Sequence, residues 1–244
     1  MKILNSKFKI FTLLAIGYWL LAISANAQSA PPLASLAESG PQFLASWKAD
    51  SYVPSWYGGK TLPSAGSNIR VSFELIDNNK IADLSRIVVR WYVDDDLISN
   101  EDEGLGIKSV KIRAPIATGD DIKVRIAVVG YKDIAELNKI VNIPVGEPEA
   151  IIDFPRYNNS AVNRSGNIFR AMPFFFNLKN SNGLSVNWLA NDRNAKESGK
   201  DPWRLDLTVD DQTPSGFEIS LEATIQNVSN QLDYANKILK LKVK

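Results

Sequence analysis

Two stretches, IVVRWYVDDD (87–96) and LSVNWLANDR (184–193), share one pattern and decide the fold class of this chain. Each is an alternating apolar run with a central tryptophan, followed by a turn rich in Asp or Asn. The two tryptophans are 97 positions apart, and at the same offset GDDIKVRIAVVG (119–130) lies over GFEISLEATIQN (216–227). Because the matched apolar residues keep the same phase of a two-residue period, the pattern indicates a tandem duplication of one unit.

The repeated unit predicts β-strands. VRIAVV, RLDLTV, EISLEATI and KILKLKV place apolar side chains at i, i+2 and i+4, which is typical of a strand with one buried face. Turn signals separate these runs at DNN (77–79), ATGD (117–120), NSNG (180–183) and TPSG (213–216). Several short strands in roughly 95 residues, with turns about every 8–12 residues, predict an antiparallel β-sandwich for each copy.

The position of the tryptophan adds a resemblance to a known fold. Trp91 and Trp188 have apolar neighbours at two-residue spacing, as does the core tryptophan in the third strand of immunoglobulin-like domains. Both units resemble bacterial immunoglobulin-like or PKD-like extracellular modules, over 48–244. The resemblance implies an all-β chain of two tandem immunoglobulin-like antiparallel β-sandwiches, which we place at 47–146 and 147–244.

The first 27 residues have the three parts of a secretory signal peptide. A basic start precedes the apolar run IFTLLAIGYWLLAI (10–23), and Ala25 and Ala27 stand at the A-x-A positions. An uncleaved membrane anchor is the alternative, although a span needs about 20 apolar residues. Residues 28–46 are rich in Ala, Ser and Pro and are predicted to be a tether. We therefore expect an exported protein that is periplasmic, at the cell surface or extracellular.

The amino-acid composition argues against some classes of partner. Without the three lysines of the signal peptide, 25 basic and 27 acidic side chains remain, so a nucleic-acid partner has no electrostatic support. The chain has no cysteine, which favours a bacterial source over a eukaryotic extracellular one. Contact with a membrane is expected only through the signal segment, if it is not cleaved.

The amino-acid composition also limits the kinds of catalytic site that this chain could form. The chain has no histidine and no cysteine, which excludes Ser-His-Asp and Cys-His sites and His- or Cys-ligated zinc. It has no G-x-S-x-G, P-loop or G-x-G-x-x-G motif. Paired carboxylates serve glycosidases, but here they lie in polar loops without the apolar setting that raises the pKa of a general acid. We predict a protein that is not an enzyme and has no cofactor.

The acidic loop VDDDLISNEDEG (93–104) is the most polar feature. Calcium takes six to eight oxygen ligands from such loops, but this one lacks the spacing and central glycine of an EF-hand. Its counterpart NDRNAKESGKD (191–201) is diluted by basic residues, which favours a solvated hairpin connection over a calcium site. The calcium candidates are Asp94, Asp95, Asp96, Glu101, Asp102 and Glu103.

The aromatic segment SWKADSYVPSWYGGK (46–60) has no equivalent in the second copy. Its ligand-binding candidates are Trp47, Tyr52, Trp56 and Tyr57. They form either a glycan-binding platform or a cap folded over an open end of the first core. The cap is favoured because large aromatic side chains are more often buried than displayed.

Two further motifs carry structural predictions. In AMPFFFNL (171–178), alternation places Phe174 and Phe176 on one face and Phe175 on the other, at an interdomain contact or exposed alone. NKIVNIPV (138–145) and NKILKLKV (236–243) are predicted to be the last strand of each sandwich. Pro144 then belongs to an edge strand or a strand end, and Lys242 is expected to guard an edge.

Together these features predict an exported, non-enzymatic cell-envelope protein with a structural, spacing or adhesive role. Its expected partner is another envelope or surface protein, or a glycan. The alternatives are a carbohydrate- or calcium-dependent binding module, and a subunit of a surface assembly such as a pilus, in which an exposed edge strand pairs with a neighbour.

Overall fold

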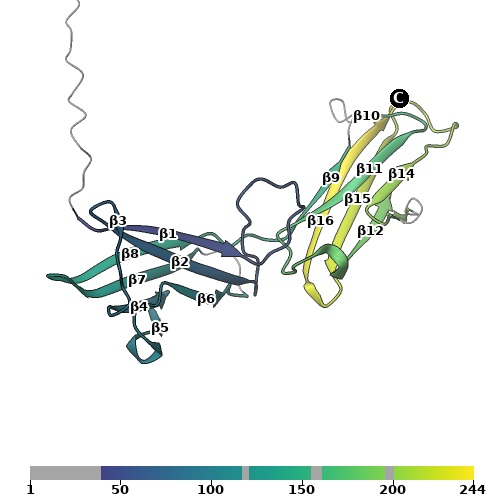
Figure 1. Ribbon diagram of the computed structural model, residues 1–244. Coiled ribbons are helices and arrows are strands. Elements are labelled where there is room, and N and C mark those ends of the chain that lie inside the picture. The colour runs from purple at the N-terminus through teal and green to yellow at the C-terminus, as the bar shows by residue number, and fades with distance from the viewer. Residues whose placement is uncertain (1–39, 117–120, 155–160, 196–200) are drawn as a thin grey trace, which may run out of the picture. The chain divides into compact units, whose positions relative to one another are not determined.

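Strands form nearly all of the regular structure in the computed structural model of this chain (Figure 1). The structure describes residues 40–116, 121–154, 161–195 and 201–244. The predicted signal peptide, and the predicted tether up to residue 39, lie outside the described residues. None of the helices in the described ranges is long and apolar enough to span a membrane.

The first sandwich consists of two four-stranded sheets. One sheet contains β1 (Gln42–Ala49), β2 (Asn68–Asp77), β3 (Lys80–Ile81) and β6 (Ser109–Arg113), with β2 at its centre. The other has the order β5 (Asp96–Ser99), β4 (Val88–Val93), β7 (Ile122–Tyr131) and β8 (Ile134–Ile143). Every pairing in both sheets is antiparallel.

The second sandwich repeats this division with sheets of three and five strands. The smaller sheet has the order β14 (Arg204–Leu207), β11 (Asn167–Phe174) and β9 (Glu149–Asp153). The larger has the order β10 (Ala161–Val162), β16 (Asn230–Val243), β15 (Glu218–Asn227), β12 (Leu184–Ala190) and β13 (Arg193–Asn194). All its pairings are antiparallel except the short parallel one between β10 and β16.

The strand order confirms the prediction of two tandem immunoglobulin-like sandwiches. In each copy the first two long strands share a sheet with the strand before the final hairpin, β6 or β14. The tryptophan strand, β4 or β12, pairs with the first strand of that final hairpin in the opposite sheet. This is the division of strands A, B and E from C, F and G in immunoglobulin-like folds.

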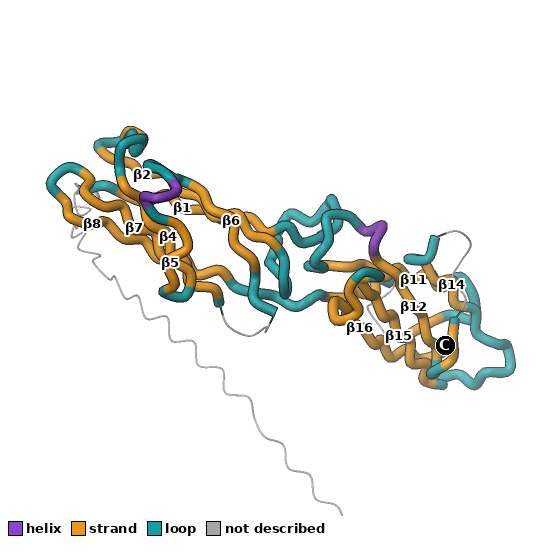
Figure 2. The backbone as a smooth tube through the Cα atoms, turned by 90° about the horizontal axis from the view of Figure 1, so that it is seen from below, coloured by secondary structure: helices purple, strands orange, loops and turns teal. Residues whose placement is uncertain are grey.

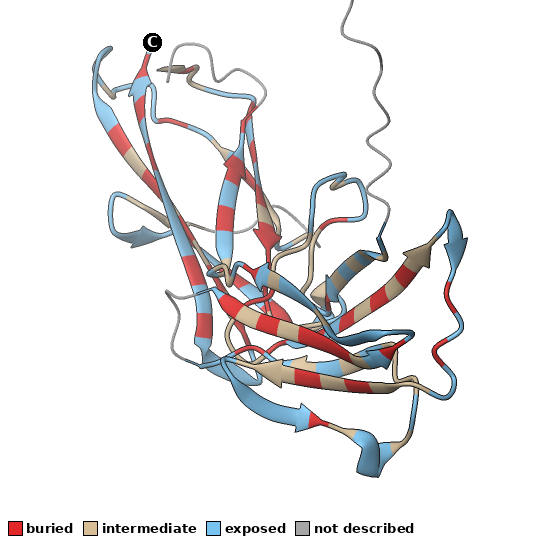
Figure 3. Cartoon of the chain, turned by 90° about the vertical axis from the view of Figure 1, so that its left-hand side faces the viewer, coloured by how far each residue is buried: buried red, intermediate tan, exposed pale blue. Residues whose placement is uncertain are grey.

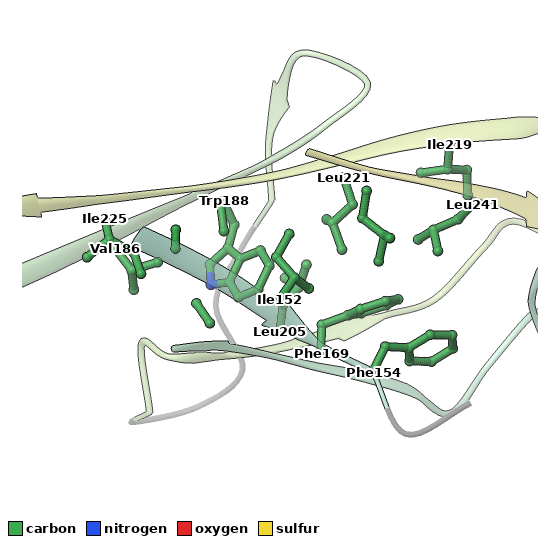
Figure 4. Packing of buried hydrophobic residues seen from close by; sticks show 14 of the residues in the cluster. Ile152, Phe154, Phe169, Val186, Trp188, Leu205, Ile219, Leu221, Ile225 and Leu241 are labelled. Carbon is green, nitrogen blue, oxygen red and sulfur yellow. The ribbon is translucent and has the colours of Figure 1, made fainter. Parts of the chain in front are cut away.

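Each sandwich has its own core, centred on the repeated tryptophan. The indole Nε1 of Trp91 donates to Ile107 O at 2.9 Å, and that of Trp188 donates to Pro202 O at 3.1 Å. Both rings are fully buried among alternating apolar side chains, and burial alternates along the strands in Figure 3. In the second core Trp188 lies near Phe169, which stacks on Phe154 with ring centroids 4.5 Å apart (Figure 4).

The hairpin turn after each tryptophan strand is also duplicated. Asp94 and Asp95 have φ of 48° and 74°, and Asn191 and Asp192 have φ of 48° and 60°. Two positive φ angles define the type I′ turn, which suits Asn and Asp because they tolerate the left-handed conformation. The side chain of Asp94 accepts from Lys123 N, and that of its counterpart accepts from Ser220 N. Asp94 and Asp95 are therefore turn residues.

The predicted tether boundary at residue 46 is wrong, because β1 begins at Gln42. Strand β1 pairs with β2 along its whole length, from Gln42↔Ile76 to Ala49↔Ile69. Its inward side chains are Phe43, Ala45 and Trp47, which pack partly buried against the first core. The first sandwich therefore starts at Gln42 and not at residue 47. The small Ala45 at an inward position weakens the apolar alternation that the sequence of this strand shows.

The predicted last strands are confirmed as β8 and β16. Pro144 directly follows the end of β8 at Ile143, where a missing backbone N–H interrupts no ladder. The edge-guarding role predicted for Lys242 is wrong, since β10 pairs with β16 at that point through Ala161↔Lys242. Within the described residues, no strand pairs with that side of β16 before Lys242.

Candidate interaction site at the joint between the two sandwiches

Residues 50–67, here called the joint segment, connect β1 to β2 as a long loop and contact the second sandwich (teal in Figure 2). Tyr52 N donates to Phe176 O at 2.7 Å, and Phe175 N donates to Tyr52 O at 2.6 Å. These two bonds form an isolated antiparallel bridge between the sandwiches. The side chain of Tyr52 packs against the second core, so a residue from the first copy helps to close the second.

Aromatic rings extend this contact. The ring of Tyr57 meets those of Phe174 and Phe175 edge-on, with centroids 5.5 and 5.9 Å away. Trp56 meets Phe174 in the same way at 5.8 Å. Edge-to-face aromatic pairs contribute about 0.5–1.5 kcal/mol each beyond their buried area. Gly59 permits the arrangement, because a Cβ there would lie 2.5 Å from Cζ of the Tyr57 ring.

The three consecutive phenylalanines depart from the predicted alternation. Strand β11 ends at Phe174, and Phe175 has φ of 61°, in the left-handed region that a bulky residue rarely adopts. This turn of the backbone leaves all three rings buried, so the assignment of two opposite faces is wrong. The prediction that Phe175 lies at an interdomain contact is confirmed by its ring contact with Tyr57.

A polar network continues the joint into the hairpin of β15 and β16. Asn177 Nδ2 donates to Ala65 O at 3.3 Å, and its backbone N donates to Asp233 Oδ2 at 3.1 Å. The same oxygen accepts from Asn227 Nδ2 at 2.8 Å. Burial raises the pKa of Asp233 above its usual range. Since the folded chain holds that proton more tightly, this group's contribution to stability falls as pH rises through the raised pKa.

The connection from β8 to β9 is held by the joint segment as well. Gly146 N donates to Pro63 O at 2.8 Å, and a Cβ at Gly146 would come within 3.2 Å of Leu62 Cδ1. The connection is therefore in close contact with residues 62–63 rather than free in solvent. The joint segment and the connection between β8 and β9 are thus in direct contact.

The structure separates the four aromatic candidates. Trp47 belongs to β1, where Lys60 Nζ lies 4.1 Å above its ring. Tyr52, Trp56 and Tyr57 contact the second sandwich, so they cover that sandwich and not the open end of the first core. Trp56 is still 64% exposed, and it is the candidate whose ring remains open to a ligand.

The acidic loop is divided among three elements. Asp94 and Asp95 form the hairpin turn, Asp96 begins β5, and Glu101, Asp102 and Glu103 form the 3-10 turn η1. Within residues 40–116, 121–154, 161–195 and 201–244, no three Asp or Glu side chains gather closely enough to hold a metal ion.

Glu101 has a protein partner within this region. Arg90 Nη2 lies 2.6 Å from Glu101 Oε1, and Arg90 Nε donates to the other carboxylate oxygen at 3.0 Å. This bidentate pair lowers the pKa of Glu101 to about 2. Any stabilisation from the pair is present above the ordinary pKa of a glutamate and is lost as pH falls through about 2.

A broad groove of about 1070 Å³ lies beside the joint segment. Gly66 and Arg113 of the first sandwich, Glu149 of β9, and Tyr234 and Lys237 of β16 line it. Its wall mixes charged and apolar side chains, and the chain supplies no histidine or cysteine to it.

No protein-family model matches this chain. A search of curated proteins likewise gives no match. Among solved structures, the chain is similar to the fibronectin(III)-like modules of CbhA from Clostridium thermocellum, with 18% identity and a TM-score of 0.28. That likeness covers 82% of this chain and 94% of the other.

Two further solved structures are similar over most of the chain. The three N-terminal domains of the highly immunogenic outer capsid protein of bacteriophage RB49 match at 9% identity and a TM-score of 0.44, over 84% of this chain and 59% of that one. Immunoglobulin domains 1–4 of Sidekick-1 match at 14% identity and a TM-score of 0.26, over 84% and 70%. Because these TM-scores lie below 0.5, the immunoglobulin-like assignment is based on the strand order of the chain itself.

Proposed function

We propose that this chain is an exported, non-enzymatic module of the cell envelope that holds two immunoglobulin-like sandwiches as one unit and presents them to a partner. The observation that carries the proposal is the joint segment. A chain that only needed two independent domains would join them by a flexible linker. Here a backbone bridge, three ring contacts and the Asn177 bond to Ala65 connect the two.

The chemistry of the chain supports a role without catalysis. It has no histidine and no cysteine to serve as base, nucleophile or soft metal ligand. Two described carboxylates whose pKa departs from the usual range have structural partners. Glu101 pairs with Arg90, and Asp233 accepts hydrogen bonds from Asn177 and Asn227. The proposed partner is another envelope or surface protein, or a glycan, and the signal peptide at 1–27 would direct export.

A held joint has a direct physical signature in solution. We expect the two sandwiches of the wild-type chain to share one rotational correlation time in backbone ¹⁵N relaxation measurements. The double variant Trp56→Ala/Tyr57→Ala should separate the two values, because it removes all three ring contacts across the joint. The expected loss of interaction free energy between the two sandwiches is about 1.5–4.5 kcal/mol, from about 0.5–1.5 kcal/mol for each of the three ring pairs.

A matched control is Tyr92→Ala, which removes an aromatic ring of the first sandwich that stacks under Arg125 and not on the second sandwich. It should leave the shared correlation time unchanged. Independent correlation times in the wild-type chain would contradict the proposal, since the joint would then be flexible.

The observation that supports the glycan alternative is the exposed ring of Trp56, which lies at the joint in contact with Phe174 of the second sandwich. Aromatic faces bind sugar rings, so this alternative requires a change in tryptophan fluorescence on addition of soluble polysaccharides. The change must be lost in Trp56→Ala and retained in Tyr92→Ala. If no polysaccharide alters the fluorescence of the wild-type chain, the glycan alternative is contradicted.

A further inference from the structure

The last strand of the first sandwich, β8, lies at the edge of its sheet, and that of the second, β16, lies next to the short edge strand β10. Strand β8 pairs with β7, and within the described residues no strand pairs with its other side. Strand β16 pairs with β15 along most of its length, and within the described residues the strand that pairs with its other side is β10, at Lys242 and Val243. The N–H and C=O groups of an uncovered edge can pair with a strand of another chain. Within the described residues, β8 and the part of β16 before Lys242 therefore each have a side on which a further strand could add.

A lysine occupies the same place on both edges. Lys139 is the cross-strand partner of Ile126, and Lys237 is that of Ala223. Both partners are fully buried in their cores. Because cross-strand partners point to the same face of a sheet, both lysines lie on the core-facing side of their strands. Both are nevertheless exposed, since a lysine at an edge can lay its stem along apolar surface and keep its ammonium in water.

The lysines interrupt an otherwise apolar series. On β16 the neighbouring inward residues are Ala235, Leu239 and Leu241, all buried, with Lys237 exposed among them. On β8 the inward Val141 packs partly buried against the first core. The repeated triplet, 138–140 and 236–238, is exposed at all three positions in both copies. Its repetition therefore does not come from the packing of a core.

We propose that Lys139 and Lys237 keep the edges of β8 and β16 from pairing with the edge strands of other copies of this chain. A strand added at either edge would extend the sheet and the core across the lysine. The ammonium would then be enclosed without a partner, which is strongly unfavourable for a charge. An inward-pointing charge on an edge strand is one way in which sheet proteins avoid edge-to-edge association.

The two lysines would thus limit the ways in which copies of this chain assemble. The two lysines oppose the addition of a strand from another copy at β8 and at β16, and they leave side-chain surfaces such as the groove or the joint open to a partner. The pilus-like alternative requires an edge that accepts a strand, and the two lysines oppose it on both last strands.

The test compares two lysines of one strand. Lys237→Val removes the inward charge, whereas Lys240→Val removes an outward charge that lies 3.7 Å from Glu218 and is 74% exposed. Both variants of the full chain, purified after export, change composition and net charge equally. Sedimentation velocity across a wide concentration range should show self-association of Lys237→Val that is about tenfold tighter or more than that of the wild type. Lys240→Val should match the wild type.

Two further measurements keep the result interpretable. Lys237→Glu retains a charge at the inward position and should stay monomeric, while circular dichroism melting shows that each variant is folded. Equal association of Lys237→Val and Lys240→Val would overturn the proposal, because loss of charge alone would then suffice. Wild-type association through β16, seen as hydrogen-exchange protection of 234–238 at high concentration, would overturn it as well.

Discussion

Replacement of Trp188 by alanine is expected to lower the free energy of unfolding of the second sandwich by about 3–5 kcal/mol, while the first sandwich retains its stability. The ring is buried at the centre of the second core and shares no buried neighbour with the first. Its removal leaves a cavity and also leaves the carbonyl of Pro202 without its indole donor. Since domains are stable by about 5–15 kcal/mol, this loss is a large fraction of the total.

Urea denaturation followed by NMR signals of each sandwich measures this effect. Trp91→Ala should produce the mirror result, with the loss confined to the first sandwich. Trp56→Ala is the control, because its ring is mostly exposed and its removal should cost about 1 kcal/mol or less. An equal loss in both sandwiches from Trp188→Ala would show that the two cores unfold as one unit, which contradicts their separate packing.

Gly106→Ala is expected to destabilise the first sandwich by more than the approximately 1–2 kcal/mol that a left-handed conformation costs a residue with a Cβ. Gly106 has φ of 67°, and a Cβ there would lie 2.5 Å from Leu84 O. That neighbour is backbone and cannot turn aside as the end of a side chain could. Gly106 N also donates to Ile87 O at 2.8 Å, which holds this loop against the start of the tryptophan strand.

The matched control for this prediction is Gly130→Ala. Gly130 has nearly the same φ, 69°, but a Cβ there would meet nothing within 4 Å. Its substitution should show the conformational cost alone. Thermal melting of both variants therefore isolates the steric contribution at Gly106. If the two variants melt at the same temperature, the loop next to Leu84 adapts and the predicted clash does not occur.

The tryptophan repeat predicted far more of the fold than its length suggests. Trp91 is the cross-strand partner of Ile126, and Trp188 is that of Ala223. The offset of 97 positions aligns Trp91 with Trp188 and Ile126 with Ala223, so the same cross-strand pair occurs in both copies. These features were predictable because alternation of burial is a local property, set by which face of a strand meets the core.

Strand β1 shows where local pattern was insufficient. Its sequence QFLASWKA alternates only weakly, and it gains its place by pairing with β2 along eight residues. The acidic loop shows the reverse case, in which a conspicuous composition had an ordinary structural cause. Asp94 and Asp95 stand where a two-residue hairpin turn requires positive φ, as Asn191 and Asp192 do in the second copy.

The joint could not be predicted from the sequence in any detail. The bond from Asn177 to Ala65 joins residues 112 positions apart, and that from Asn177 to Asp233 joins residues 56 positions apart. No periodicity links such residues, because their contact depends on how two finished sandwiches meet. The aromatic segment was recognised as unusual, but its destination on the second sandwich follows from the bridge of Tyr52 to Phe176.

The sequence by itself determined that this chain is all-β, that it contains one unit twice, and that a buried tryptophan centres each copy. Those conclusions depend on a two-residue period and on hydrophobic burial, both of which act between near neighbours and cross-strand partners. Tertiary structure alone decided which strands pair with one another, where Lys139 and Lys237 point, and which rings close the joint. Each of these depends on the registry of strands and on the meeting of two surfaces, which no single stretch of sequence specifies.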